Sequence, residues 1–542
     1  MTVINNVRGW TRRRGPGARP DRAGYARLFA QDRAAPHWAY DYADRLARRH
    51  PADHRILIQT SMSPSGTFHI GNLRDTICAH LVHRALVRTG RRSAVLLSFD
   101  DFDPFRQSQA VAGTELAPYG GRPLALARER STAICRTYLR ALKDLGICPP
   151  DADPDGRMPV GAAWETHYQW ERYTSGTYRE IQRRYVRHAD RLAALLGVED
   201  PRRLFAVYCQ QCGRNTTTIH ELRPDQVRYD CRSCGAFVTT EVMECVKPSW
   251  ALDWTLRVAY EHIDCEPAGQ DHCSSGSTMD RTQPIYDRFL GSDQPVIVPY
   301  GLIRQPGQRQ KISGSRAGGL APDDLLRVMP PTMILWLYAR PNCLSDMRLG
   351  LDRGSVLAAY AGYDRFLSRV PVAPRARKLY ELLTDAPVPD GPPLPSIRRV
   401  LGLLHATLYD AGRVLDELAA EAPAADRAAL AERVRHALAW VSGPGRGTSW
   451  LHGPAPAGTG TGTALLAGSL AGRWDRARHA ALLGALFGVA SGPPLRRLLD
   501  AFAEAEVVDA VTAFDNTGAR PLLRRVTDRL DAVTVTGGSC AR

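Results

Sequence analysis

The spacing of hydrophobic positions changes between two neighbouring stretches of the chain. Residues 55–60 form a nearly continuous apolar run, which is typical of a strand buried in a parallel sheet. Further on, apolar residues recur every four positions, which indicates a helix that ends near Gly90. These residues are Leu73, Ile77, Leu81 and Ala85. A second apolar run at residues 94–99 predicts another strand, so the pattern favours an α/β fold.

Residues 63–72 (Ser-Pro-Ser-Gly-Thr-Phe-His-Ile-Gly-Asn) connect the first predicted strand to the helix. A helix start presents backbone N–H groups and the positive end of the helix dipole, and both favour a phosphate. We expect His69 and Asn72 to flank that phosphate. Gly71 has no Cβ to obstruct a nucleotide lying against the backbone. The turn is therefore a candidate nucleotide site.

A second motif, Gln-Lys-Ile-Ser-Gly-Ser-Arg at residues 310–316, follows the apolar run 295–300. The chain contains four lysines, at positions 143, 247, 311 and 378, and arginine supplies the other 67 of its 71 basic residues. A lysine in a small-residue loop can close on a triphosphate and neutralise charge as pyrophosphate leaves. We expect Lys311, with Ser313 and Ser315, to do this; the alternative is a solvated loop.

Two carboxylates, Asp100 and Asp101, follow the second predicted strand. In open α/β sheets, ligands bind beyond the carboxyl ends of the strands, so these side chains should face the same crevice as His69. A carboxylate there can hold a substrate ammonium group. For either residue, the alternative is a solvated turn or a helix N-cap.

Length and composition indicate the number of domains, the class of protein and the kind of partner. A chain of 542 residues exceeds a single hydrophobic core, and 44 % apolar with 23 % charged residues is typical of globular domains. There is no apolar run of 18 residues and no apolar segment behind the basic N-terminus, which predicts a cytoplasmic protein without a membrane span. A net charge of +15 favours a polyanionic partner such as nucleic acid.

Four of the twelve cysteines form two Cys-x-x-Cys pairs separated by 18 residues. They are Cys209, Cys212, Cys231 and Cys234. Gly213 and Gly235 follow the pairs and permit the tight turns that would aim four thiolates at one ion. Four thiolates leave no open coordination position, so we predict a structural zinc ribbon over residues 205–238. The alternative is a set of reduced thiols.

The remaining segments are assigned by pattern. Residues 106–205 look helical, and helical patterns also dominate after residue 362, for example at 397–422 and 425–441. The basic composition of residues 1–36, with interspersed Gly and Pro, predicts a mobile arm. The Gly/Pro/Thr-rich stretch that begins at Gly453 predicts a flexible loop.

Taken together, the His69 and Lys311 motifs resemble the two signature motifs of class I aminoacyl-tRNA synthetases. Further segments in register are similar to the class I lysyl-tRNA synthetases, continuously from about residue 37 to 366 and weakly to about 510. Those segments are residues 99–106, 116–124, 173–178, 250–254, 266–272, 329–331 and 338–342.

This resemblance implies activation of lysine by ATP with Mg²⁺, followed by transfer to tRNA(Lys). It implies that His69, Asn72, Lys311, Ser313 and Ser315 are catalytic. It further implies that Gly66, His69, Gly71, Asn72 and Lys311 bind ATP, and that Gly66, Asp100, Asp101, Trp250 and His272 bind lysine. Trp250 can pack against the methylenes or the cation of lysine, and His272 can make a polar contact.

The implied architecture is a Rossmann-type catalytic domain with a zinc-ribbon insertion and a C-terminal α-helical domain. The catalytic halves cover residues 37–105 and 246–320, and a connective insertion that meets the tRNA acceptor end covers residues 106–245. A stem-contact region covers residues 321–362, and an anticodon-binding domain covers residues 363–542.

Residues 125–137, Ala251 and Gln270 depart from the family pattern. Two alternatives therefore stay open. One is a paralogue that activates lysine or a modified amino acid without charging tRNA. The other is a non-catalytic RNA-binding protein on a synthetase scaffold. The oligomeric state is not predicted.

Overall fold

The computed structural model describes residues 35–66, 68–106, 114–148, 163–274, 276–308, 319–445, 466, 476–487, 489, 492–517 and 519–536. The chain divides into two compact units. The first comprises Met1–Pro322, Tyr338–Arg348 and Leu382–Thr384, and the second comprises Asp323–Leu337, Leu349–Glu381 and Asp385–Arg542. Three predicted features lie outside the described residues: all but the end of the basic arm, the motif around Lys311 with Ser313 and Ser315, and the loop that begins at Gly453.

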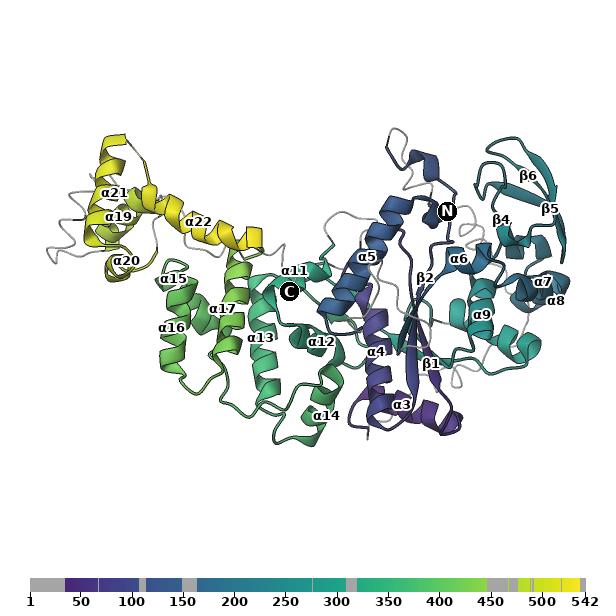
Figure 1. Cartoon of the computed structure of the whole chain (residues 1–542), viewed down its shortest axis with the longest axis horizontal. Coiled ribbons are helices and arrows are strands. Elements are labelled where there is room, and N and C mark those ends of the chain that lie inside the picture. Colours follow the sequence, from purple (N-terminus) through teal and green to yellow (C-terminus); the bar gives the residue numbers. More distant parts are fainter. Residues whose placement is uncertain are drawn as a thin grey trace. The chain divides into compact units, whose positions relative to one another are not determined.

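A five-stranded, wholly parallel sheet forms the centre of the first unit, in the order β10-β9-β1-β2-β3 (Figure 1). Its strands are β1 (Ile56–Met62), β2 (Ser93–Phe99), β3 (Trp164–Tyr168), β9 (Cys265–Gly269) and β10 (Val296–Tyr300). The predicted α/β fold with a parallel sheet is confirmed. Three of the strands, β1, β2 and β10, coincide with the predicted apolar runs, because both faces of a parallel sheet are covered.

Successive residues of β1 point to opposite faces of the sheet. The Thr60 hydroxyl donates to Asp75 of α4 (Leu73–Arg88). The Gln59 amide donates to Glu266, which also accepts from Trp254 of α9 (Trp250–Glu261). This follows from the two-residue period of a strand. On the α4 side lie α3 (Trp38–Arg49) and α5 (Arg128–Asp144), and α10 (Thr278–Ile285) packs beside α9.

The expectation that residues 106–205 are helical is wrong at one segment. Residues Trp164–Tyr168 form β3, which pairs with β2 as the edge strand of the central sheet. Its sequence, Trp-Glu-Thr-His-Tyr, has few apolar residues. Of its three buried side chains, Trp164, Glu165 and His167, two are polar, so the apolar signal that identified β1, β2 and β10 is absent here.

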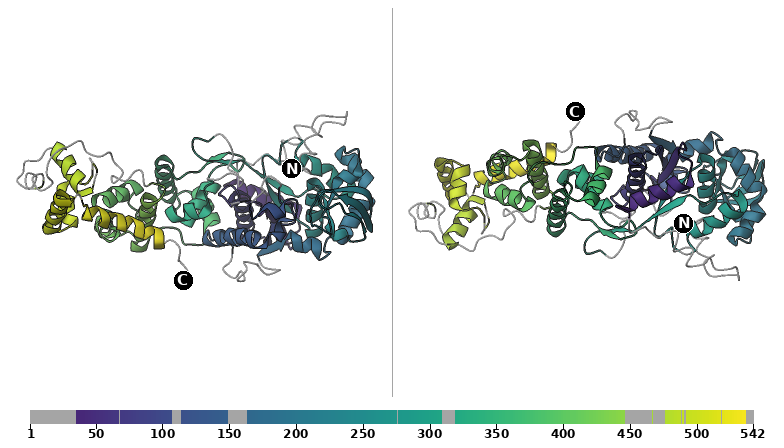
Figure 2. Two further views of the ribbon diagram at one scale, coloured as in Figure 1. Left: turned by 90° about the horizontal axis from the view of Figure 1, so that it is seen from above. Right: turned by 90° about the horizontal axis from the view of Figure 1, so that it is seen from below.

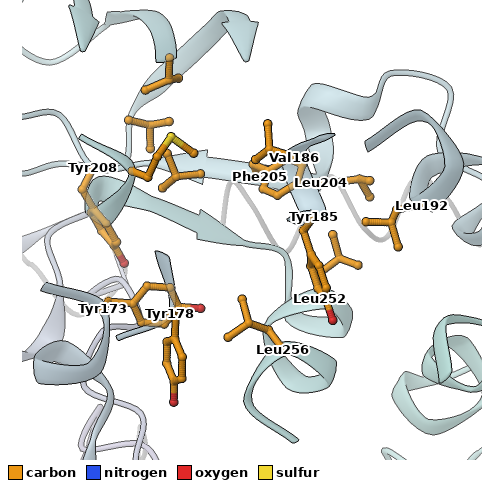
Figure 3. Close-up of a cluster of buried hydrophobic side chains, with 14 of the residues drawn as sticks. Tyr173, Tyr178, Tyr185, Val186, Leu192, Leu204, Phe205, Tyr208, Leu252 and Leu256 are labelled. Atoms are coloured by element: carbon orange, nitrogen blue, oxygen red, sulfur yellow. The ribbon is translucent and has the colours of Figure 1, made fainter. Parts of the chain in front are cut away.

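The insertion between the two halves of the sheet carries its own apolar cluster (Figure 3). Its helices are α6 (Gln169–Thr174), α7 (Arg179–Arg187) and α8 (Ala189–Leu196). Its strands form an antiparallel pair, β4 (Phe205–Val207) with β8 (Val246–Pro248), and an antiparallel sheet of β5 (Thr217–Arg223), β6 (Gln226–Cys231) and β7 (Phe237–Thr240). Tyr173, Tyr185 and Tyr208 belong to the same buried cluster as Leu252 and Leu256 of α9, so this cluster joins the insertion to a helix that covers the central sheet.

The second unit is helical in its described parts, as both views in Figure 2 show for the green and yellow segments. Helices that lie wholly within it include α13 (Arg353–Leu367), α15 (Ile397–Ala406), α16 (Ala411–Glu421), α17 (Arg427–Ser442) and α22 (Pro521–Thr536). The predicted pattern at 397–422 is broken once, where Leu408 and Tyr409 adopt positive φ and bury their side chains. Among the residues described, no helix is both long and apolar enough to span a membrane.

Candidate functional site

The turn between β1 and α4 is closed by its own side chains. The His69 N–H donates to Asn72 Oδ1 over 3.1 Å, and the Gly71 N–H donates to His69 Nδ1 over 3.1 Å. A Cβ at Gly71 would lie 2.8 Å from the His69 ring, so this glycine first makes room for the imidazole. The structure therefore brings His69, Gly71 and Asn72 together at the start of α4, and Gly66 lies earlier in the same turn.

The chain that carries the second motif returns to this turn. The described part of the chain stops at Gln308 and resumes at Gly319. The carbonyl of Leu320 then accepts the N–H of Ile70 over 2.9 Å. The Tyr338 hydroxyl donates to the Ile70 carbonyl over 2.7 Å. The chain at Leu320, nine residues after Lys311, is thus held against the His69 turn.

Asp100 and Asp101 lie at the predicted edge of the sheet, where the Asp100 N–H donates to the carbonyl of Met62 at the end of β1. Both carboxylates have partners within the protein. Asp100 accepts from the Arg257 guanidinium, and Asp101 accepts the N–H of Trp170 in the first turn of α6 over 2.7 Å. Burial raises the pKa of Asp101 to about 7. Asp101 is buried and contacts the start of a helix distant in the sequence, so it is neither a solvated turn nor the N-cap residue of α6, which is Tyr168.

Arg257 belongs to a buried ionic network that the sequence analysis missed. Its guanidinium also donates to Asp253 over 3.0 Å, and the Lys247 ammonium lies 3.1 Å from Asp253 and 2.9 Å from Asp103. Burial opposes ionisation of Asp253, but the two cations hold the pKa of this carboxyl below its usual value. The available signal was the spacing of Asp253 and Arg257, one helical turn apart.

Trp250 and His272 are brought together at the carboxyl edge of the sheet. Their ring centroids are 6.4 Å apart, and the Arg257 guanidinium lies 5.4 Å from the Trp250 ring centre. The Trp250 Nε1 atom is buried and has no hydrogen-bond partner among the described residues. His272 Nδ1 lies 3.2 Å from the Thr278 hydroxyl. Their predicted contact with an amino acid remains a prediction.

Two further buried carboxylates were not identified from the sequence. Asp75 is hydrogen-bonded to the Thr60 and Tyr300 hydroxyls, and burial raises its pKa to about 7. Glu266 accepts from Gln59 and Trp254, and burial raises its pKa to about 8. In the described parts of the chain, neither carboxylate forms an ion pair. An acidic residue in the first turn of a helix normally complements the helix dipole, so Asp75 gave no distinct signal.

The four predicted cysteines converge. One sulfur from each lies within 4.8 Å of the others, with Cys209 Sγ 3.7 Å from Cys234 Sγ and Cys212 Sγ 3.6 Å from Cys231 Sγ. The two pairs form matching turns. The N–H of Gly213 donates to Cys209 O over 2.7 Å, and that of Gly235 donates to Cys231 O over 2.8 Å. Both glycines have φ near +70°, which favours glycine.

Comparison with known proteins assigns this arrangement to one family. The model of the family described as tRNA synthetases class I (K) matches residues 36–127 and 157–384. These ranges contain the His69 turn, the Lys311 motif, the four cysteines and the Trp250–His272 pair.

Curated relatives extend the likeness. A lysine--tRNA ligase of Borrelia garinii is 31 % identical over 61 % of this chain and 63 % of its own length. One from Streptomyces coelicolor is 25 % identical over 77 % of this chain and 80 % of its own length. One from Thermococcus kodakarensis is 27 % identical over 61 % of this chain and 63 % of its own length. The chain thus spans less than two thirds of the first of these relatives.

Proposed function

Because the chain belongs to the class I tRNA synthetases (K), we propose that it activates lysine with ATP and transfers the lysyl group to tRNA. The relatives described above carry the name lysine--tRNA ligase, which supports lysine as the amino acid. Family members use ATP with Mg²⁺, and the magnesium ion neutralises charge on the triphosphate.

The observation that carries this proposal is the hydrogen bond between Ile70 and Leu320. It anchors the chain that follows the Lys311 motif against the turn that holds His69. We propose that Lys311, nine residues before Leu320, contacts a triphosphate bound at the start of α4. The proposed chemistry requires that these two motifs, far apart in the sequence, act on one ligand, and the contact between Ile70 and Leu320 supports this arrangement.

In the first step, the lysine carboxylate attacks the α-phosphate of ATP, a new P–O bond forms, and pyrophosphate leaves. His69 and Asn72 contact the phosphates at the helix start. Lys311, Ser313 and Ser315 then close over the leaving group as its charge develops. In the second step, a terminal ribose hydroxyl of tRNA attacks the lysyl carbonyl and AMP leaves.

Selection of lysine requires a buried carboxylate that can accept an ammonium group. Asp100 already faces Arg257, and Asp101 accepts a backbone N–H. Asp75 is bound by neutral hydroxyls, lies one helical turn beyond Asn72, and is partly buried with a raised pKa. We assign the lysine ammonium to Asp75, with Trp250 and His272 as further contacts. An arriving cation would favour the ionised form of this carboxyl.

The four cysteines fit a structural zinc ion. A tetrahedral site with Zn–S bonds of about 2.3 Å places its sulfurs about 3.8 Å apart. The two closest sulfur pairs of the cluster lie 3.7 and 3.6 Å apart. We therefore propose that the antiparallel module of β5, β6 and β7 is a zinc ribbon. Bound zinc would hold its two glycine turns together.

The remaining assignments are further parts of the proposal. The net charge of +15 supports tRNA as the polyanionic partner. The helical region after residue 363 is the proposed anticodon-binding domain, and the insertion between the sheet halves is the proposed acceptor-end contact.

The decisive experiment is ATP–pyrophosphate exchange across the twenty amino acids, with and without total tRNA, followed by a tRNA-charging assay. We expect lysine to support both reactions. Lys311→Ala should lower exchange by at least about 10²-fold, because it removes charge stabilisation of the transition state. Lys378→Ala is the matched control, since Lys378 pairs with Glu381 on one exposed helix.

Each other outcome has a defined meaning. Exchange without charging of any tRNA would favour the paralogue that transfers lysine elsewhere. Loss of ATP binding by the native protein would favour the non-catalytic RNA-binding alternative. Unchanged exchange in Lys311→Ala would remove the assignment of this lysine.

A further inference from the structure

A second cluster of metal-ligating side chains lies at the edge of the sheet opposite the His69 turn. The loop between α3 and β1 contributes His50 and His54, and Asp264 directly precedes β9. One ligand atom from each side chain lies within 4.8 Å of the others. Because His69 follows the carboxyl end of β1 and these residues precede the amino ends of β1 and β9, the cluster stands apart from the nucleotide site.

The sheet fixes the carboxylate of this cluster. The Leu57 N–H donates to Asp264 Oδ2 over 2.9 Å, and the Asp264 N–H donates to the Leu57 carbonyl over 3.0 Å. The Asp264 carbonyl accepts the N–H of Val296 in β10 over 2.9 Å. The side chain is 9 % exposed. The carboxylate oxygens therefore point in a direction set by three strands.

The two imidazoles are arranged in parallel above that carboxylate. Their ring centroids are 4.5 Å apart with an interplanar angle of 11°. His54 Nε2 lies 2.9 Å from Asp264 Oδ2, and His50 Nε2 lies 3.4 Å from Oδ1. His50 Nε2 is buried and makes no hydrogen bond to any described residue.

Neighbouring arginines secure the loop and restrict the kind of ion. The Arg91 guanidinium donates to the carbonyls of Ala47, His50 and Pro51. Arg49 pairs with Asp293 over 3.1 Å. These positive charges oppose a cation held by charge alone. They favour an ion that bonds strongly to imidazole nitrogen over a hard ion such as Mg²⁺ or Ca²⁺.

We propose that His50, His54 and Asp264 bind one divalent transition-metal ion, for which Zn²⁺ is the best fit. The three ligand atoms lie within 4.8 Å of one another, and a small side-chain movement would bring them to about 3.3 Å apart, the separation that bonds of about 2 Å give in a tetrahedral site. Water completes the coordination. The ion ties the α3–β1 loop to the start of β9, and its role is to stabilise the fold rather than to act on substrate.

The test counts zinc in the full-length protein after saturation with Zn²⁺ and removal of loosely bound metal. The double variant His50→Asn/His54→Asn should hold one ion fewer per chain than the wild type. It should also lose part of the rise in Tm that added Zn²⁺ produces. His188→Asn is the control, because His188 is exposed and belongs to neither metal-ligating cluster of the described residues. Its zinc content should not change.

A second variant keeps the proposal testable if the double variant folds poorly. Asp264→Asn retains an oxygen that can accept the Leu57 N–H but removes the charge. Its Kd for Zn²⁺ at this site, measured in competition with a chelating dye, should rise by at least about tenfold. Zinc content and affinity equal to wild type in these variants would overturn the proposal and leave a hydrogen-bonded cluster only.

Discussion

Buried carboxylates in the first unit differ in what neutralises them. Asp100 and Asp253 face the Arg257 guanidinium, whereas Asp75 and Glu266 accept hydrogen bonds from neutral groups. A buried carboxyl without a cation has a raised pKa, because burial penalises its charged form. Asp75 combines this state with a position one helical turn from Asn72. This combination is why we assign the substrate ammonium to it.

The affinity for lysine should therefore depend on pH through Asp75. Its pKa of about 7 means that the ionised fraction rises roughly tenfold between pH 6 and pH 8. We expect lysine to bind about tenfold more tightly at pH 8 than at pH 6, measured by calorimetry. The Asp75→Asn variant should bind weakly at both pH values.

The contribution of Asp75 to the free energy of unfolding should fall as the pH rises, whereas the affinity for lysine should increase. The folded protein keeps a proton on Asp75 that the unfolded chain releases above its ordinary pKa of about 4. The stabilisation from this carboxyl is thus complete at low pH and is lost as the pH rises through 7.

Asp101→Asn is the control for the lysine-binding measurement, since burial also raises the pKa of Asp101 to about 7. If only this variant loses the pH dependence of lysine binding, the residue that binds the lysine ammonium is Asp101 and not Asp75.

The Arg257 network should be essential to the stability of the first unit. The side chains of Arg257 and Asp253 are 3 % and 1 % exposed. Arg257→Met would leave Asp100 buried without its cation, so we expect a loss of about 3–5 kcal/mol, seen as a lower urea midpoint. Arg399→Met removes an exposed pair with Glu421 and should cost less than about 1 kcal/mol. Equal effects of the two substitutions would contradict this prediction.

At the scale of elements, the antiparallel module of β5, β6 and β7 is short and partly exposed, and Phe237 is 65 % exposed. A small module of this kind buries little apolar surface, so bound zinc can supply much of its stability.

Cys231→Ser should therefore lose one zinc ion per chain and open this module to limited proteolysis, measured by metal analysis and by mapping the cleavage sites. Cys245→Ser is the control, because Cys245 lies close to the module in sequence but not among the four converging cysteines. Full zinc occupancy in Cys231→Ser would show that the cluster does not depend on this ligand.

At the scale of the whole molecule, the charge of +15 predicts a salt-sensitive interaction with tRNA. A protein that contacts about six phosphates loses roughly 10³-fold in affinity between 50 and 200 mM salt, because bound counterions are released. We expect the Kd for tRNA to rise by about this factor, whereas the Kd for lysine should change far less. Equal salt dependence of the two would show that the basic residues do not contact the nucleic acid.

Much of the architecture follows from local signals. The strand–turn–helix from Ile56 to Arg88 and the two cysteine turns each lie within a short stretch, where periodicity and glycine positions are diagnostic. The edge strand β3 was missed because its sequence lacks an apolar run. The break at Leu408 and Tyr409 was missed because nothing in the helical pattern requires positive φ.

The sequence alone determined the class of fold, the family and the four cysteines that converge, since these depend on contiguous motifs, whereas the cluster of His50, His54 and Asp264 appeared only in the structure. The tertiary structure decided which carboxylates are neutralised. Asp100 meets Arg257 across 157 residues, and Asp75 meets Tyr300 at the end of β10. Burial and charge pairing arise only when distant segments pack together, so no local pattern could separate an occupied carboxylate from one able to receive a substrate.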